Sequence, residues 1–167
     1  MFGRWLISLR TLSLLKGVPV YNEKTGKLLG NVSDICITTT GEVKSLVLDG
    51  KGLFSRDRLI PIASIASIGS GGVMVKCNLE TLPMVQQNKT THFISSHHGL
   101  FRKPVLSAEG EKLGLLEDVY FQEELGTIIG YELTDGFFAD ITEGKKVVRT
   151  NQPITVGKDV IVVDVKP

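Results

Sequence analysis

Two aspartates, Asp34 and Asp118, occupy matching places in two similar stretches of the chain. Paired carboxylates can perform general acid–base catalysis when both groups flank one substrate. No histidine, cysteine or second acid recurs beside either aspartate, so neither has a recognisable catalytic partner. Aspartate side chains also accept backbone N–H bonds at bends of the chain. We therefore expect both aspartates to support the backbone, and we predict no catalytic residue.

The three histidines, His92, His97 and His98, lie within one polar segment and could be combined with Cys77 into a metal site. Structural zinc sites require ligand pairs at a fixed spacing, such as C-x2-C or H-x3-H. Neither spacing occurs here. We interpret the three histidines as surface residues, and we predict no metal site and no bound cofactor.

A third candidate site combines three basic residues, Lys51, Arg56 and Arg58, with Phe54 between them. Basic groups around an exposed aromatic ring can hold RNA phosphates and stack a base. The alternative is a solvated loop in which Phe54 folds back over its own domain. We favour the solvated loop and keep these four residues as a candidate contact with a partner; RNA binding would then be weak.

The first ten residues carry apolar side chains at helical spacing, with Arg4 and Arg10 beside them. The apolar positions are Phe2, Trp5, Leu6 and Leu9. Such a pattern is typical of a helix that lies on a membrane surface. A flexible tail, or an extension that precedes the folded part, would account for the segment equally well.

Composition limits the classes of protein to consider. The chain has 167 residues, 42% of them hydrophobic and 22% charged, which is typical of a globular protein. No apolar run approaches the roughly 18 residues of a membrane-spanning helix. The formal net charge of +1 is far from that of a strongly basic nucleic-acid binder. Two cysteines are too few for a disulfide framework and indicate a reducing, cytoplasmic location.

An internal repeat organises the whole chain. Four positions or pairs recur in the same order: Pro19-Val20 as Pro104-Val105, Gly26 as Gly110, Gly30 as Gly114, and Asp34 as Asp118. We expect two domains, 14–77 and 100–167, joined by a polar linker over 78–99 and preceded by an extension over 1–13. Domains of this size are marginally stable alone, so we expect the two to pack together or the protein to self-associate.

Within each copy the apolar residues alternate with a period of two, which predicts strands. The alternation breaks at Ser33-Asp34, where we expect a bulge in a long strand over 27–38. A short helical turn is expected after Leu59-Ile60-Pro61-Ile62. Short strands at this spacing, with glycines at the corners, predict a small antiparallel barrel in each copy.

Two motifs now carry a family resemblance. The sequences K-L-L-G-N-V-S-D-I (27–35) and K-L-G-L-L-E-D-V (112–119) resemble the G-x-V-x-D-V signature of PRC-barrel domains. L-I-P-I-A-S-I (59–65), followed by G-S-G-G-V-M-V (69–75), is similar to the second half of that pattern. The second copy departs from the pattern at 137–143, where an extra helical turn is expected. The resemblance implies an all-β fold of two tandem barrels, with Gly30, Asp34, Gly114, Asp118 and Pro61 as structural residues.

The resemblance also implies binding and scaffolding, without catalytic residues to transfer. The family includes the cytoplasmic domain of the photosynthetic reaction-centre H subunit and the C-terminal domain of the ribosome maturation factor RimM. We therefore expect a non-enzymatic adaptor that docks a macromolecular partner, with a protein preferred. One alternative is an RNA- or ribonucleoprotein-associated factor. The other is a peripheral partner of an electron-transfer type complex at the inner face of a membrane.

Overall fold

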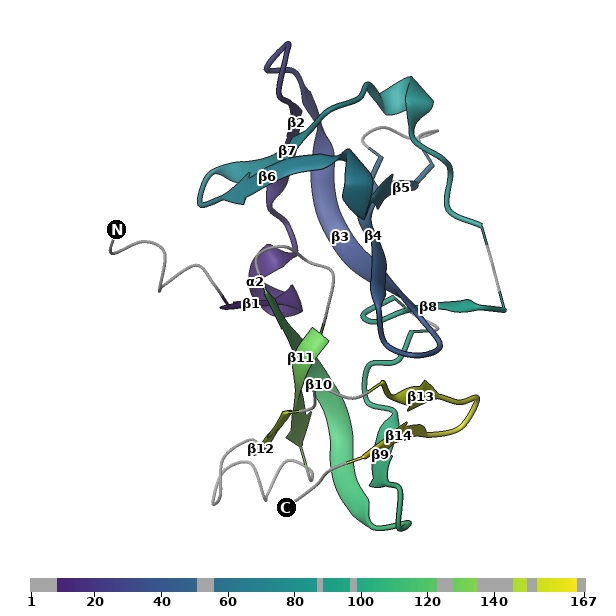
Figure 1. The fold of residues 1–167 in the computed structure, drawn as a ribbon. Helices are drawn as coiled ribbons and strands as arrows, with labels where there is room; N and C mark the ends of the chain where they lie inside the picture. The colour runs from purple at the N-terminus through teal and green to yellow at the C-terminus, as the bar shows by residue number, and fades with distance from the viewer. Residues whose placement is uncertain are drawn as a thin grey trace.

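The computed structural model describes residues 9–50, 56–86, 89–96, 99–122, 128–134, 146–149 and 153–164. Over these ranges the chain consists mainly of strands, arranged in two separate seven-stranded sheets (Figure 1). Each sheet is formed chiefly by one copy of the repeat, and we call the two copies module 1 and module 2. The predicted all-β fold with a tandem arrangement is confirmed. No helix in the described ranges is long and apolar enough to cross a membrane.

Module 1 has the strand order β5-β4-β3-β2-β7-β6. Its elements are β2 (Pro19–Asn22), β3 (Leu28–Thr38), β4 (Val43–Asp49), β5 (Arg58–Pro61), the 3-10 turn η1 (Ile62–Ser64), β6 (Ile65–Gly69) and β7 (Gly72–Val75). The pairs are antiparallel except for β2 with β7, which is parallel. The predicted antiparallel arrangement therefore includes one parallel pair that the sequence did not indicate. The chain returns to β2 only after four intervening strands, and a connection of that length permits a parallel pair.

Module 2 repeats the same order as β12-β11-β10-β9-β14-β13. Its strands are β9 (Pro104–Ser107), β10 (Lys112–Gln122), β11 (Ile128–Thr134), β12 (Lys146–Arg149), β13 (Thr155–Val156) and β14 (Ile161–Val163). Here too one pair is parallel, β9 with β14. The extra turn expected over 137–143 lies outside the described residues.

Both long strands are interrupted by a bulge at the position of the repeated aspartate. The register of β3 shifts between Val32 and Asp34, where the sequence predicted it, and that of β10 shifts between Leu116 and Asp118. A bulge adds one residue to a strand and bends it. Asp34 and Asp118 are consequently buried, at 3% and 6% exposure, although carboxylates usually face water.

Each module receives a short strand from the segment that leads into the other module. The strand β1 (Leu9–Thr11), which precedes module 1, pairs with β10 of module 2. The strand β8 (Thr91–Phe93), which precedes module 2, pairs with β3 of module 1. The registers match as well: Thr11 lies opposite Tyr120, and Phe93 lies opposite Cys36, two residues after the bulge aspartate in each case. The two modules therefore exchange equivalent strands.

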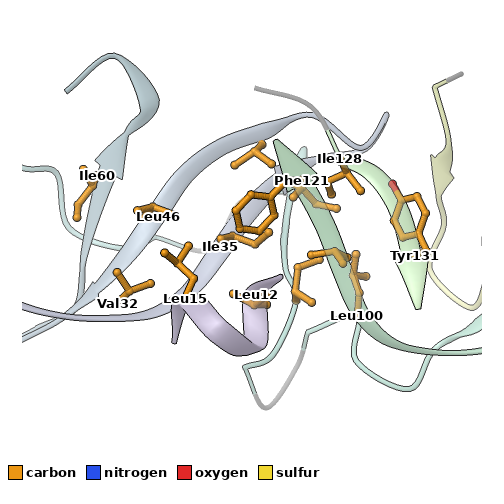
Figure 2. Packing of buried hydrophobic residues seen from close by; sticks show 14 of the residues in the cluster. Leu12, Leu15, Val32, Ile35, Leu46, Ile60, Leu100, Phe121, Ile128 and Tyr131 are labelled. Carbon is orange, nitrogen blue, oxygen red and sulfur yellow. The ribbon is translucent and has the colours of Figure 1, made fainter. Parts of the chain in front are cut away.

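This exchange produces one hydrophobic core in place of two. The short helix α2 (Leu12–Leu15) continues from β1 and buries Leu12 and Leu15, at 3% and 2% exposure. Both belong to a single cluster that also contains Ile35 of β3 and Phe121 of β10 (Figure 2). A further contact links the modules, because Val156 N–H donates to the Thr39 carbonyl at 2.9 Å. The modules thus pack together, as their small size led us to expect.

The segment 78–99, read from its polarity as a linker, contains several ordered elements. It holds the 3-10 turn η2 (Leu79–Thr81), a bridge between Met84 and Arg58 of β5, and β8. At the other end of the chain, Leu9 lies in β1 and not in a helix, which corrects the helical reading there. Residues 1–8 lie outside the described part. Pairing of β1 and β8 with the opposite module overrides their weak local patterns.

We predict that Gly30→Ala lowers the free energy of unfolding by about 1–3 kcal/mol, the usual cost of overpacking. A Cβ atom at Gly30 would lie 2.5 Å from the Asp49 carbonyl oxygen and 2.9 Å from Leu48 Cδ1. Gly71→Ala is the control, because its Cβ would meet no atom within 4 Å. Urea unfolding of both variants tests this; equal midpoints would contradict the close approach at Gly30.

Candidate functional site

The buried carboxylate of Asp34 accepts hydrogen bonds from its own bulge and from the segment that follows β8. Its Oδ1 accepts from the N–H of Ile35 at 2.8 Å and from that of Ser95 at 3.0 Å. Its Oδ2 accepts from the N–H of Ser96 at 3.0 Å. A carboxylate with several N–H donors forms strong, charge-assisted bonds. Asp34 therefore fastens the start of module 2 to the long strand of module 1.

Asp118 forms the reciprocal connection. Its Oδ1 accepts from the N–H of Val119 at 2.8 Å and from that of Ser13 at 3.3 Å. Its Oδ2 accepts from the Ser13 hydroxyl at 2.6 Å. Ser13 follows β1 as Ser95 follows β8. The two aspartates with their serines form a pair of cross-module latches, each joining one module to the strand that it received from the other.

The remaining chemistry-bearing residues do not assemble around these carboxylates. Among the described residues, no group of three or more His, Cys, Asp and Glu side chains could hold a metal ion. Cys36 is buried and Cys77 partly buried, and neither forms a disulfide. Burial raises the pKa of the Cys36 thiol above its ordinary value, which keeps it protonated and unreactive.

One histidine, His92, differs from the surface residue expected from the sequence. His92 lies in β8, opposite Ile37, and its Nε2 atom is buried without a hydrogen-bond partner. Burial lowers the pKa of His92, and the nearby Lys103 lowers it further. The neutral form is therefore favoured in the folded protein. His97 and His98 lie outside the described residues.

The basic loop proposed as an RNA contact is only partly described. Residues 51–55, which include Lys51 and Phe54, lie outside the described part. Arg56 is exposed, whereas the Arg58 guanidinium donates to the Leu82 carbonyl at 2.9 Å and is only partly exposed. Arg58 thus holds a neighbouring segment of its own chain. Its partner Leu82 belongs to an extended segment that we call the strap, Leu82–Val85.

The strap covers the outer edge of β5. The Leu59 N–H donates to the Pro83 carbonyl at 2.8 Å, and the Val85 N–H donates to the Asp57 carbonyl at 3.0 Å. These bonds pair the strap antiparallel to β5, with Met84 opposite Arg58. Sequence reasoning missed the strap because only four apolar residues, L-P-M-V, interrupt a polar stretch. Proline between apolar residues was the available signal, since it favours an extended chain.

Beside the strap lies an open groove of about 960 Å³, which sequence reasoning also missed. Its walls come from β3, β4, β5, β8 and the strap, elements that are distant in sequence. The apolar lining includes Leu59, Ile62, Pro83, Met84 and Phe93. Met84 is 44% exposed, an unusually open position for a large apolar side chain in this protein. A groove of this kind presents apolar surface that water does not favour.

We predict that Asp34→Ala lowers the free energy of unfolding by about 1–3 kcal/mol, because three N–H groups lose their acceptor. Asp34→Asn keeps one acceptor oxygen and should cost less. Urea unfolding measures both, and amide exchange should speed up at Ser95 and Ser96 in the Ala variant. A wild-type midpoint for Asp34→Ala would contradict the latch.

The second latch is tested by a double-mutant cycle on Ser13 and Asp118. We expect a coupling of about 0.5–3 kcal/mol between Ser13→Ala and Asp118→Asn, because the first variant removes the hydroxyl donor and the second removes the charge of its acceptor. The control cycle pairs Ser13→Ala with Asp34→Asn in the other latch. Additive effects in the first cycle would show that the bond contributes nothing to stability.

Comparison with known proteins agrees with this arrangement. The PRC-barrel domain model matches two segments of the chain, residues 9–80 and 95–167. Both matches extend beyond the domain limits expected from the repeat, and the first includes β1. The chain is also 35% identical to the "Uncharacterized protein YrrD" of Bacillus subtilis (strain 168) over 159 residues, which cover 94% of this chain and 88% of that protein. Two matching segments, two sheets with the same strand order and a shared bulge aspartate show that this chain belongs to the PRC-barrel domain family, as a tandem member.

Proposed function

We propose that this protein is a non-catalytic binding module that docks a partner protein in the groove of module 1. The groove carries this proposal because it is open, combines apolar with polar lining residues and is built on paired strands. Exposed methionine adapts to different partner surfaces through its flexible, polarisable side chain. The two charged residues of the lining, Glu42 and Lys44, are of opposite sign. Such a lining suits a protein surface better than a polyanion.

We further propose a cytoplasmic location, where the free thiols of Cys36 and Cys77 would stay reduced. RNA is the less favoured partner. Arg58 is engaged with the strap, which removes one of the three cations that a phosphate contact would require. An RNA-binding surface there would depend on the remaining basic residues alone.

Met84→Glu tests the groove. Met84 is 44% exposed, so the variant should fold with little loss of stability while placing a charge in the apolar lining. With the full-length chain as bait, we expect Met84→Glu to reduce capture of a partner protein by about tenfold or more, as at an interface hot spot. Leu28→Glu is the matched control, because Leu28 is 40% exposed and does not line the groove.

Labelled single-stranded RNA, titrated at two salt concentrations, separates the two classes of partner. We expect no saturable RNA binding at about 0.15 M salt, where screening is substantial. Tight binding that falls steeply with salt would reveal phosphate contacts and overturn the proposal. Capture that is equal for wild type, Met84→Glu and Leu28→Glu would show that the groove is not the docking site.

A further inference from the structure

The two modules differ at one edge that the repeat makes directly comparable. In module 1, Val47 pairs with Leu59 of β5; in module 2, Glu132 pairs with Val147 of β12. Val47 lies opposite Asp34, and Glu132 lies opposite Asp118, so Val47 and Glu132 occupy equivalent positions in the two modules. Strand β12, with the sequence K-V-V-R, therefore occupies the place of β5, with the sequence R-L-I-P.

The outer edge of β5 is paired by the strap, whereas β12 ends its sheet. No pairing on the outer edge of β12 occurs among the residues that the structure describes. The exposed fraction of Val147 is 48%, while its equivalent Leu59, beside the strap, is only partly exposed. Its neighbour Val148 packs against the core. Within the described ranges, the side chain of Val147 is thus exposed and its backbone edge carries no paired strand, whereas the strap pairs with the equivalent edge of module 1.

The direction of the Val147 N–H follows from the equivalence. The Leu59 N–H points away from β4, because it donates to Pro83 of the strap. The same register places the Val147 N–H on the side of β12 away from β11. Residues two apart in a strand direct their N–H groups to the same side, so the N–H of residue 61 would also face away from β4. Pro61 has no N–H, and its presence in β5 therefore removes no bond to β4. An unpaired edge of this kind is a template for strand addition.

Charge decides which occupant fits the edge. Strand β12, with the sequence K-V-V-R, carries two basic residues and no acidic residue. Pairing with the same strand of a second copy would bring two such sequences together, and like charges across a strand pair are unfavourable. The strap that covers the equivalent edge is apolar and follows an acidic residue, Glu80. We therefore expect a strand that pairs with β12 to resemble the strap, with apolar residues next to an acidic one.

We propose that the outer edge of β12 is a strand-addition site for a partner protein, which supplies an extended apolar segment flanked by a carboxylate. The segment pairs antiparallel to β12, as the strap pairs with β5, and accepts the Val147 N–H through a backbone carbonyl. This goes beyond the groove of module 1, because it adds a second contact on the other module. It rests on the proposed function only in treating the chain as a binding protein.

The probe is a labelled peptide with the sequence of residues 79–86, L-E-T-L-P-M-V-Q, titrated into the full-length protein by fluorescence anisotropy. We expect saturable binding that Val147→Pro weakens by about tenfold or more, because one N–H donor is removed. Val147→Thr is the matched control, since it keeps the N–H and the β-branched shape. A peptide in which Glu80 is replaced by lysine should bind more weakly than the parent.

Stability and amide exchange test the edge independently of the peptide. Val147→Pro should melt within a few degrees of wild type, because an edge proline removes no ladder bond. In the free protein the Val147 amide should exchange faster than that of Val148, and peptide should slow it. A large loss of stability in Val147→Pro, or a Val147 amide already protected, would show that the edge is paired and overturn the proposal.

Three further outcomes would also overturn it. Absence of peptide binding would reject this occupant, and peptide binding that survives Val147→Pro would place the peptide elsewhere. A dimer in sedimentation that Val147→Pro dissociates would make a second copy the occupant. Met84→Glu should leave peptide binding unchanged, so failure at the groove and failure at the β12 edge are distinguishable.

Discussion

The reciprocal exchange of β1 and β8 is the constraint on which the rest of this structure depends. A module of this size buries so little apolar surface that it would be only marginally stable alone. Each module gains a strand and a buried aspartate contact from the other, and the two sets of apolar residues merge into one cluster. The latches work because a buried carboxylate must be satisfied by donors. Each aspartate has one donor in its own bulge, and its remaining donors, on Ser95 and Ser96 or on Ser13, come from the segment exchanged with the other module.

Duplication explains both the symmetry of the latches and the asymmetry of the surfaces. The core and the bulges are equivalent in the two modules, because both must bury the same kind of aspartate within a long strand. The outer strands are under no such constraint. In module 1 the strap pairs with β5 and forms one wall of an open groove. In module 2 the equivalent strand carries basic residues and an exposed valine. A shared core thus presents two different surfaces.

Much of the fold was predictable from local patterns. The repeat, the long bulged strands and the turn after Pro61 all leave short-range signals: alternation, a phase break, and glycine or proline at corners. The parallel pair of β2 with β7 was not predictable, because strand direction depends on the path of the intervening chain. Of the candidate site residues, the aspartates were located correctly in sequence, but their partners Ser13 and Ser95 were not. Nothing near either serine in sequence indicates a buried carboxylate from another module.

The sequence by itself determined the duplication, the family, the strand content and the places where the backbone bends, since each depends on the order of neighbouring residues. Tertiary structure alone decided which module each short strand joins, because β1 and β8 have weak patterns and gain their stability from pairing at a distance. It also decided the use of Arg58, which could have faced a phosphate and instead binds the strap carbonyl of Leu82. The groove likewise depends on tertiary structure, because its walls come from five segments that only folding brings together.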